Sequence, residues 1–261
     1  YLRRSWHPRR VSIRFSPLWR DLMNELDTLQ GKKIAIIGLG ISQVDFAIGQ
    51  QNGQVWDEVW CINSAGGTYP CDRIFMLDPA SRFYDTEDAG YQTNAMTRLL
   101  DSTEVPVYTC ELDPRIKNPI IFPVAEVCNA TKCAYLNNTV AYAIAFALYH
   151  KVGRIDLFGI DFSYKENLHF AEAGRACVEF WISKCMSADI LVGISGRSTV
   201  LDSNVPAHEK LYGFHRLEKP LVAVPHEGKF LIGPFEEINE ELEKQGLKIN
   251  EDVVPPEPYK G

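Results

Sequence analysis

Residues 154–164 read Arg-Ile-Asp-Leu-Phe-Gly-Ile-Asp-Phe-Ser-Tyr, and this stretch decides the fold. A short apolar run ends in Gly159-Ile160-Asp161 and opens into a polar segment that contains Tyr164 and His169. The pattern predicts a buried strand whose end carries a carboxylate, a phenol and an imidazole. In open α/β folds, ligands bind beside the carboxyl ends of the strands. We therefore expect a ligand site next to Asp161.

Strand-like and helix-like segments alternate on both sides of this stretch. Strands are expected at 32–37, 58–62, 73–77, 107–109, 120–122, 155–158 and 190–194. Helices are expected at 139–148, after an Asn137 or Asn138 cap, and at 171–186. The alternation predicts an α/β, Rossmann-like domain with a mostly parallel sheet and helices on both faces.

The two ends of the chain differ in charge. Residues 235–245 are acidic and have the spacing of an amphipathic helix. We expect an arginine-rich arm over 1–29, the Rossmann-like domain over 30–205 and a C-terminal extension over 206–261 that packs on the domain or mediates association. The arm suits contact with nucleic acid or an acidic partner, and the alternative is a solvated or self-docking segment. The arm's arginines are Arg3, Arg4, Arg9, Arg10, Arg14 and Arg20.

The composition is that of a globular protein. The longest apolar run, 140–148, is far shorter than the roughly 20 residues that cross a bilayer. Because no basic start leads into a signal-peptide core, we expect a cytoplasmic protein without a membrane span. The 7 cysteines form no CxxC pair, which favours free thiols over disulfides or a zinc site.

Small and polar residues gather where the expected strands end. Gly38, Gly40 and Ser42 follow the first strand, Asn63 follows the second, and Asn138 stands at a helix start. Glycines allow a ligand to approach the backbone, and a helix N-terminus offers N–H groups to an anion. These five residues predict a nucleotide-sized crevice. The alternative is that the two asparagines only cap the structures that follow them.

Two common nucleotide-binding classes lack their signatures here. The Gly38-Leu39-Gly40 turn has no third glycine of a dinucleotide fingerprint, and Asn63 stands where an acidic residue would end the second strand. A Walker-type phosphate loop is also absent from the sequence. The sequence therefore disfavours an NAD-dependent redox enzyme and a P-loop kinase.

The order of these motifs resembles the bacterial sialyltransferases of glycosyltransferase family 42. The wider clan also includes proteins related to motility accessory factors and to an archaeal pterin pyrophosphokinase. The run HFAEAGRACVEFW is similar to one in uncharacterised proteins of tailed bacteriophages. The resemblance covers about residues 32 to 205. It rests on the segments 33–42, 60–63, 138–148, 158–162, 169–181 and 198–201.

The resemblance implies a transferase that uses a nucleotide-activated sugar, usually a cytidine monophosphate sugar, without a metal ion or a tightly bound cofactor. His169 matches the family's catalytic base, Asn63 a nucleotide-contacting asparagine, and Tyr164 a phosphate-binding tyrosine. Asp161 lies at the equivalent strand end and joins them as a catalytic candidate, with tying of loop amides as its alternative role. Imidazole and phenol suit removal of an acceptor proton and stabilisation of a leaving phosphate.

The sequence departs from the family in its first loop, where Leu39 and Ile41 replace the usual asparagine and proline. Two other classes therefore stay open. A pyrophosphokinase-like enzyme would need magnesium, for which Asp78 and Asp161 are the available carboxylates. A non-catalytic phage protein would use the arginine-rich arm on nucleic acid or a virion partner. The sugar, the acceptor and the oligomeric state are left open.

Overall fold

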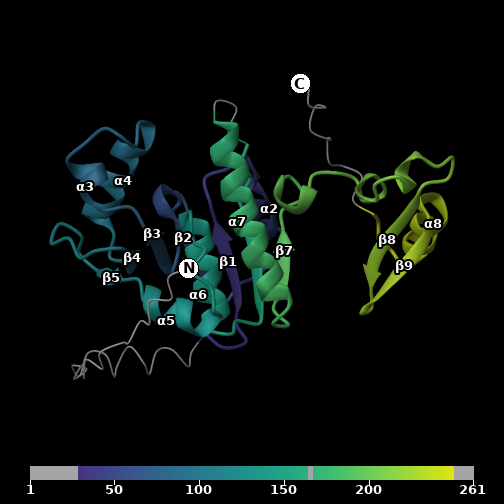
Figure 1. Cartoon of the computed structure of the whole chain (residues 1–261), viewed down its shortest axis with the longest axis horizontal. Helices are drawn as coiled ribbons and strands as arrows, with labels where there is room; N and C mark the ends of the chain where they lie inside the picture. The colour runs from purple at the N-terminus through teal and green to yellow at the C-terminus, as the bar shows by residue number, and fades with distance from the viewer. Residues whose placement is uncertain (1–28, 164–166, 250–261) are drawn as a thin grey trace, which may run out of the picture.

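The computed structural model describes residues 29–163 and 167–249, and its centre is one parallel sheet. The strand order is β5-β4-β3-β2-β1-β6-β7, so the order reverses at β1, which lies between β2 and β6 (Figure 1). All neighbouring strands of this sheet run parallel. The strands are β1 (Lys33–Ile37), β2 (Glu58–Ile62), β3 (Arg73–Met76), β4 (Val107–Thr109), β5 (Pro119–Ile121), β6 (Arg154–Phe158) and β7 (Leu191–Ile194).

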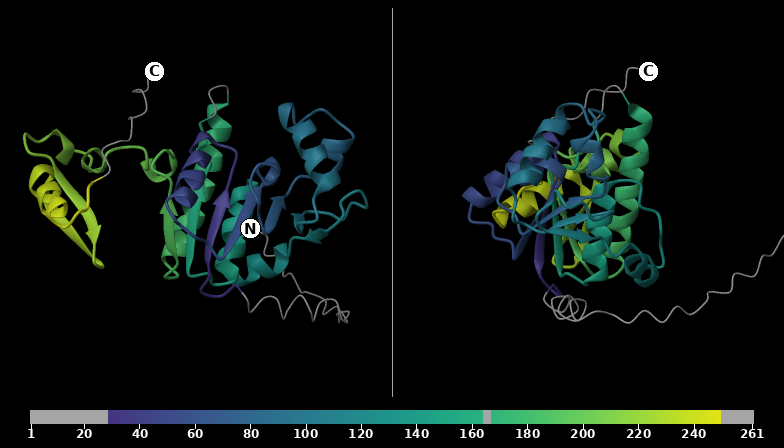
Figure 2. Two further views of the ribbon diagram at one scale, coloured as in Figure 1. Left: turned by 180° about the vertical axis from the view of Figure 1, so that it is seen from behind. Right: turned by 90° about the vertical axis from the view of Figure 1, so that its left-hand side faces the viewer.

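Helices cover both faces of the sheet (Figure 2). Along β1, Ile34 and Ile36 belong to the core beneath α6 and α7, whereas Ala35 and Ile37 pack with Phe46 of α2 on the other face. Because both faces are buried, the central strands are almost continuously apolar. The predicted Rossmann-like α/β class is confirmed. The helices are α2 (Val44–Gln51), α3 (Ser81–Tyr84), α4 (Tyr91–Ser102), α5 (Val124–Thr131), α6 (Thr139–Tyr149) and α7 (Leu168–Met186).

The helix after β6 begins earlier than the sequence pattern indicates. The expected start was residue 171, but α7 begins at Leu168. The side chain of Asn167 caps it by accepting a hydrogen bond from the Phe170 N–H, with a distance of 3.1 Å. His169 therefore lies in the first turn of α7 rather than in the loop before it.

A second, smaller unit follows the sheet. Strands β8 (Leu221–His226) and β9 (Lys229–Pro234) form an antiparallel hairpin, and α8 (Phe235–Lys244) packs on it. The expected amphipathic helix is confirmed, and its Leu242 is 3% exposed. In Figure 1 this unit lies beyond the β7 edge of the sheet.

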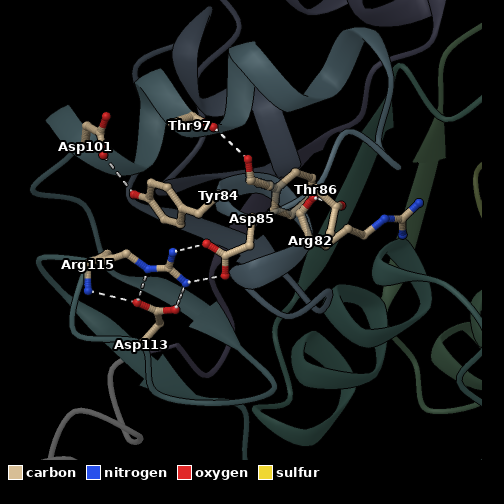
Figure 3. A network of polar contacts seen from close by, with 9 residues as sticks. Arg82, Tyr84, Asp85, Thr86, Thr97, Asp101, Asp113 and Arg115 are labelled. Carbon is tan, nitrogen blue, oxygen red and sulfur yellow. Dashed lines mark hydrogen bonds and ion pairs between the residues drawn. The ribbon is translucent and has the colours of Figure 1, made fainter.

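A network of charged side chains joins α3 to the loop between β4 and β5 (Figure 3). The Arg115 guanidinium donates hydrogen bonds to the carboxylates of Asp85 and Asp113, at 2.7 Å in each case. It also lies over the ring of Tyr84, 4.4 Å from the ring centroid. Arg115 thus links two segments that are 30 residues apart in sequence.

No helix in the described part of the chain is both long and apolar enough to cross a membrane.

Candidate functional site

The loop after β1 packs directly on the loop after β6, at the carboxyl edge of the sheet. The Gly40 N–H donates a 2.7 Å hydrogen bond to the carbonyl oxygen of Gly159. A Cβ atom added to Gly38 would collide with that same oxygen, and one added to Gly40 would collide with the carboxylate of Asp161. Both positions therefore need glycine, because the loop after β1 lies too close to the loop after β6 to leave room for a side chain.

The side chain of Asp161 connects these two loops through hydrogen bonds. Its side chain accepts a 2.8 Å hydrogen bond from the Ser42 N–H and a second, short one from the Ser42 hydroxyl. The same hydroxyl accepts a 2.9 Å hydrogen bond from the Gly159 N–H. Asp161 is only 4% exposed. The structure thus brings Gly38, Gly40, Ser42 and Asp161 together, with the carboxylate turned into the protein.

Two hydroxyl groups from the turn after β7 donate hydrogen bonds to the backbone of the segment that follows β6. The Ser198 hydroxyl donates a 2.6 Å hydrogen bond to the Ile160 carbonyl, and the Thr199 hydroxyl donates to the Asp161 carbonyl. The sequence reveals neither contact, although a cluster of hydroxyl residues at a strand end is a weak signal for such a role. The β6–α7 loop is consequently anchored at Asp161 from both sides.

The solvent-facing part of the first loop is aliphatic. Leu39 is 40% exposed and Ile41 is 77% exposed. These are the two positions of the first loop at which the sequence departs from the family it resembles. A ligand at this point would meet apolar side chains.

Asn63 presents an unused acceptor at the same edge of the sheet. It follows β2 directly, and β2 is the neighbour of β1. Its backbone has a φ of 49°, in the left-handed region, and its Oδ1 atom is buried with no hydrogen-bond partner in the structure. A buried acceptor without a donor costs free energy.

Asn138 has a structural task. Its Oδ1 atom accepts a 3.0 Å hydrogen bond from the Ala141 N–H and so caps α6. Its Nδ2 atom donates to the carbonyl oxygen of Gly174 in α7, at 3.2 Å, and to the Asn137 side chain, at 2.7 Å. The amide of Asn138 therefore fixes the start of α6 against α7.

His169 is exposed in the first turn of α7. It is five residues before Gly174, the position that Asn138 contacts, which places it about 7–8 Å further along the helix axis. Its imidazole makes no hydrogen bond or ion pair with the residues that the structure describes. Tyr164, the other predicted catalytic side chain, lies outside the described residues.

Two hollows on the described part of the chain are lined by none of the predicted site residues. One, of about 410 Å³, lies along the outer face of α7, and a second, of about 260 Å³, lies at the amino edge of the sheet. The first is lined by Glu179, Ile182, Ser183, Met186, Ser187 and Leu201.

The two carboxylates that could serve a magnesium ion already have protein partners. Asp161 is held by Ser42, and Asp78 forms an ion pair with Arg82 at 2.5 Å. Within residues 29–163 and 167–249, no three His, Cys, Asp or Glu side chains gather in a way that could hold a metal ion.

Comparison with known proteins gave a structural likeness but no match in sequence. No family model matches the chain, and no curated protein matches it. Among solved structures, the chain is similar to the sialyltransferase CstII from Campylobacter jejuni, determined in complex with the substrate analogue CMP-3FNeuAc. The two are 15% identical, and the match covers 81% of this chain and 98% of that chain with a TM-score of 0.39.

Proposed function

We propose that this chain is a glycosyltransferase-like enzyme that transfers a sugar from a nucleotide-activated donor, a cytidine monophosphate sugar, to an acceptor hydroxyl. The observation that carries the proposal is the exposed imidazole of His169 in the first turn of α7, the helix that follows β6. The exposed imidazole of His169 is available to take a proton, and the buried Oδ1 atom of Asn63 lacks a donor. The sequence resemblance assigns the base to His169 and a nucleotide contact to Asn63.

His169 acts as the general base in this proposal. It removes the proton from the acceptor hydroxyl as that oxygen attacks the anomeric carbon of the donor sugar, and the bond from the sugar to the phosphate breaks. An imidazole suits this role because its unperturbed pKa lies near neutral pH. Tyr164, assigned from the sequence resemblance alone, donates a hydrogen bond to the departing phosphate.

The sequence resemblance assigns Asn63 a contact with the nucleotide. An amide acceptor can receive a hydrogen bond from the exocyclic amino group of cytosine, whereas uracil carries no amino group there. Asp161 and Ser42 do not touch the substrate in this proposal. They hold the first loop against the β6–α7 loop and so position the segment that leads to His169.

Replacement of His169 by alanine tests the base. We expect turnover to fall by about 10²- to 10⁴-fold, the usual contribution of a general base, while the dissociation constant for the nucleotide changes little. Steady-state kinetics and calorimetric titration with cytidine, uridine and guanosine nucleotides provide the two measurements. Glu172→Gln, an exposed position in the same helix, is the matched control and keeps wild-type turnover. Unchanged turnover in His169→Ala removes this residue from the mechanism, and absence of binding by every nucleotide removes the donor assignment.

The pyrophosphokinase-like alternative has less support, since the carboxylates of Asp78 and Asp161 are already engaged. Magnesium-dependent nucleotide binding would favour it over a transferase. The nucleic-acid-binding alternative depends on the arginine-rich arm, which lies outside the described residues and stays a prediction from sequence.

A further inference from the structure

The hairpin unit carries a strand with a free edge. β8 and β9 form a sheet of their own, separate from the parallel sheet (Figure 1). The 3-10 helices Ala207–Lys210 and Phe214–Arg216 pack against β8, whereas the neighbours of β9 are chiefly β8 and α8. One side of β9 therefore has no strand beside it in the described part of the chain.

The hydrogen-bond pattern of the hairpin determines which backbone groups point outward. The Phe235 N–H donates a 2.9 Å hydrogen bond to the Pro220 carbonyl, so these two residues form a hydrogen-bonded pair at the base of the hairpin. In an antiparallel ladder such pairs recur at every second residue. The N–H and carbonyl groups of Phe230 and Ile232 consequently point away from β8. In the observed register, the hydrogen-bonded pairs that follow are 222–233, 224–231 and 226–229.

The outward-facing stretch of β9 is also apolar and exposed. Phe230 is 65% exposed and Ile232 is 69% exposed. An exposed apolar edge with unpaired N–H and carbonyl groups is a template for pairing with another strand. The outer edge of β8 is different, because Pro225 stands opposite Phe230 and has no N–H to donate. β9 is thus the strand of this hairpin that suits pairing.

We propose that β9 pairs with β9 of a second copy of this chain, antiparallel about a two-fold axis at Leu231. Phe230 of each copy then lies opposite Ile232 of the other, and each such pair exchanges both N–H···O bonds. Leu231 faces its own counterpart. The same patch is used on both copies, as a two-fold interface requires, and the two hairpins become one four-stranded sheet of ordinary size.

The charges of the hairpin unit favour a second copy as the partner. In this register Lys229 falls opposite Gly233 of the other copy, so no like charges meet across the axis. Lys229 and Gly233 share the face that α8 covers, and a Cβ added to Gly233 would lie 3.2 Å from Ile238 of α8. The exposed Lys229 thus comes beside an acidic helix of the other copy. The carboxylates of this helix are Glu236, Glu237, Glu240, Glu241 and Glu243.

The molar mass of the full chain in solution tests the pairing. Light scattering after size-exclusion chromatography should give the wild type twice the mass of one chain. Phe230→Lys combined with Ile232→Lys should halve this mass, because lysines would then stand directly opposite one another. Phe214→Lys with Leu217→Lys is the matched control, since it adds the same charge at exposed positions of the same unit outside β9. The control should stay a dimer. A monomeric wild type, or equal masses for the two variants, would overturn the proposal.

A mixture of oppositely charged variants tests the register. Phe230→Glu combined with Ile232→Glu should be monomeric by itself, for the same reason as the lysine variant. Mixed in equal amounts, the glutamate and lysine variants should regain the mass of two chains, because each glutamate then lies opposite a lysine. A mixture that stays monomeric would overturn antiparallel pairing about Leu231.

Discussion

At the scale of single residues, Gly40 shows how closely the candidate site is packed. A side chain at this position would enter the space of the Asp161 carboxylate and of the Gly159 carbonyl. We expect Gly40→Ala to lower the free energy of unfolding by about 1–3 kcal/mol, as small-to-large changes in packed regions do. Urea denaturation measures the effect. Gly67→Ala is the control, since a Cβ there meets nothing within 4 Å. Equal free energies of unfolding for Gly40→Ala and Gly67→Ala would show that the loop after β1 accommodates the added methyl group without destabilisation.

The sequence identifies Asp161 as a strand-end carboxylate but does not reveal what it binds. Its partner Ser42 is 119 residues away in the chain, and only the pairing of β1 with β6 brings the two together. Local patterns predict which groups end a strand, whereas contacts between strand ends depend on the order of strands in the sheet.

At the scale of helices and strands, Asn138 has a measurable role as a cap. Replacement by alanine removes the acceptor for the Ala141 N–H and the donor to the Gly174 carbonyl. We expect the free energy of unfolding to fall by about 0.5–2 kcal/mol, the usual cost of losing an N-cap. Thermal or urea denaturation provides the measurement. Asn137→Ala is the comparison, because Asn137 donates to the Ala173 carbonyl and accepts from the Asn138 side chain but caps no helix. A cost in Asn137→Ala as large as in Asn138→Ala would contradict the capping role.

The stabilisation that Arg115 gives by joining α3 to the β4–β5 loop should depend on pH. Hydrogen bonds from Arg115 lower the pKa of Asp113 to about 2. Because the pKa of a free Asp side chain is about 3.9, the ionised carboxylate favours the folded state above that pH, and this contribution is lost as the pH falls through about 2. The difference in stability between the wild type and Arg115→Gln should therefore shrink on acidification from about pH 4 to about pH 2.

Denaturation curves over this pH range test the link. Arg98→Gln is a matched control, since the exposed side chain of Arg98 donates, among the described residues, only to the Asn94 carbonyl of its own helix. That variant should differ from the wild type by the same amount at every pH. A constant difference for Arg115→Gln as well would assign the stabilisation to something other than the ionised Asp113.

Element boundaries were predicted well where apolar periodicity was strong. The predicted and observed ranges of β2, β4 and α6 agree within one residue. The hairpin of β8 and β9 was not predicted, although Glu227-Gly228 between two apolar runs is a recognisable turn signal. Short antiparallel strands outside the main alternation carry less local information than strands buried on both faces.

At the scale of the whole molecule, the hairpin unit has a core of its own. Val222, Leu242 and Ile249 form a cluster separate from those of the parallel sheet. Leu242→Ala should cost about 2–5 kcal/mol, the usual loss for a buried leucine, which is enough to unfold so small a unit. Hydrogen exchange should then lose protection over 221–244 but keep it in β6. Leu247→Ala, at an exposed position nearby, should preserve both. Loss of protection in β6 would show that the two parts unfold together, and the boundary predicted at residue 205 would then be wrong.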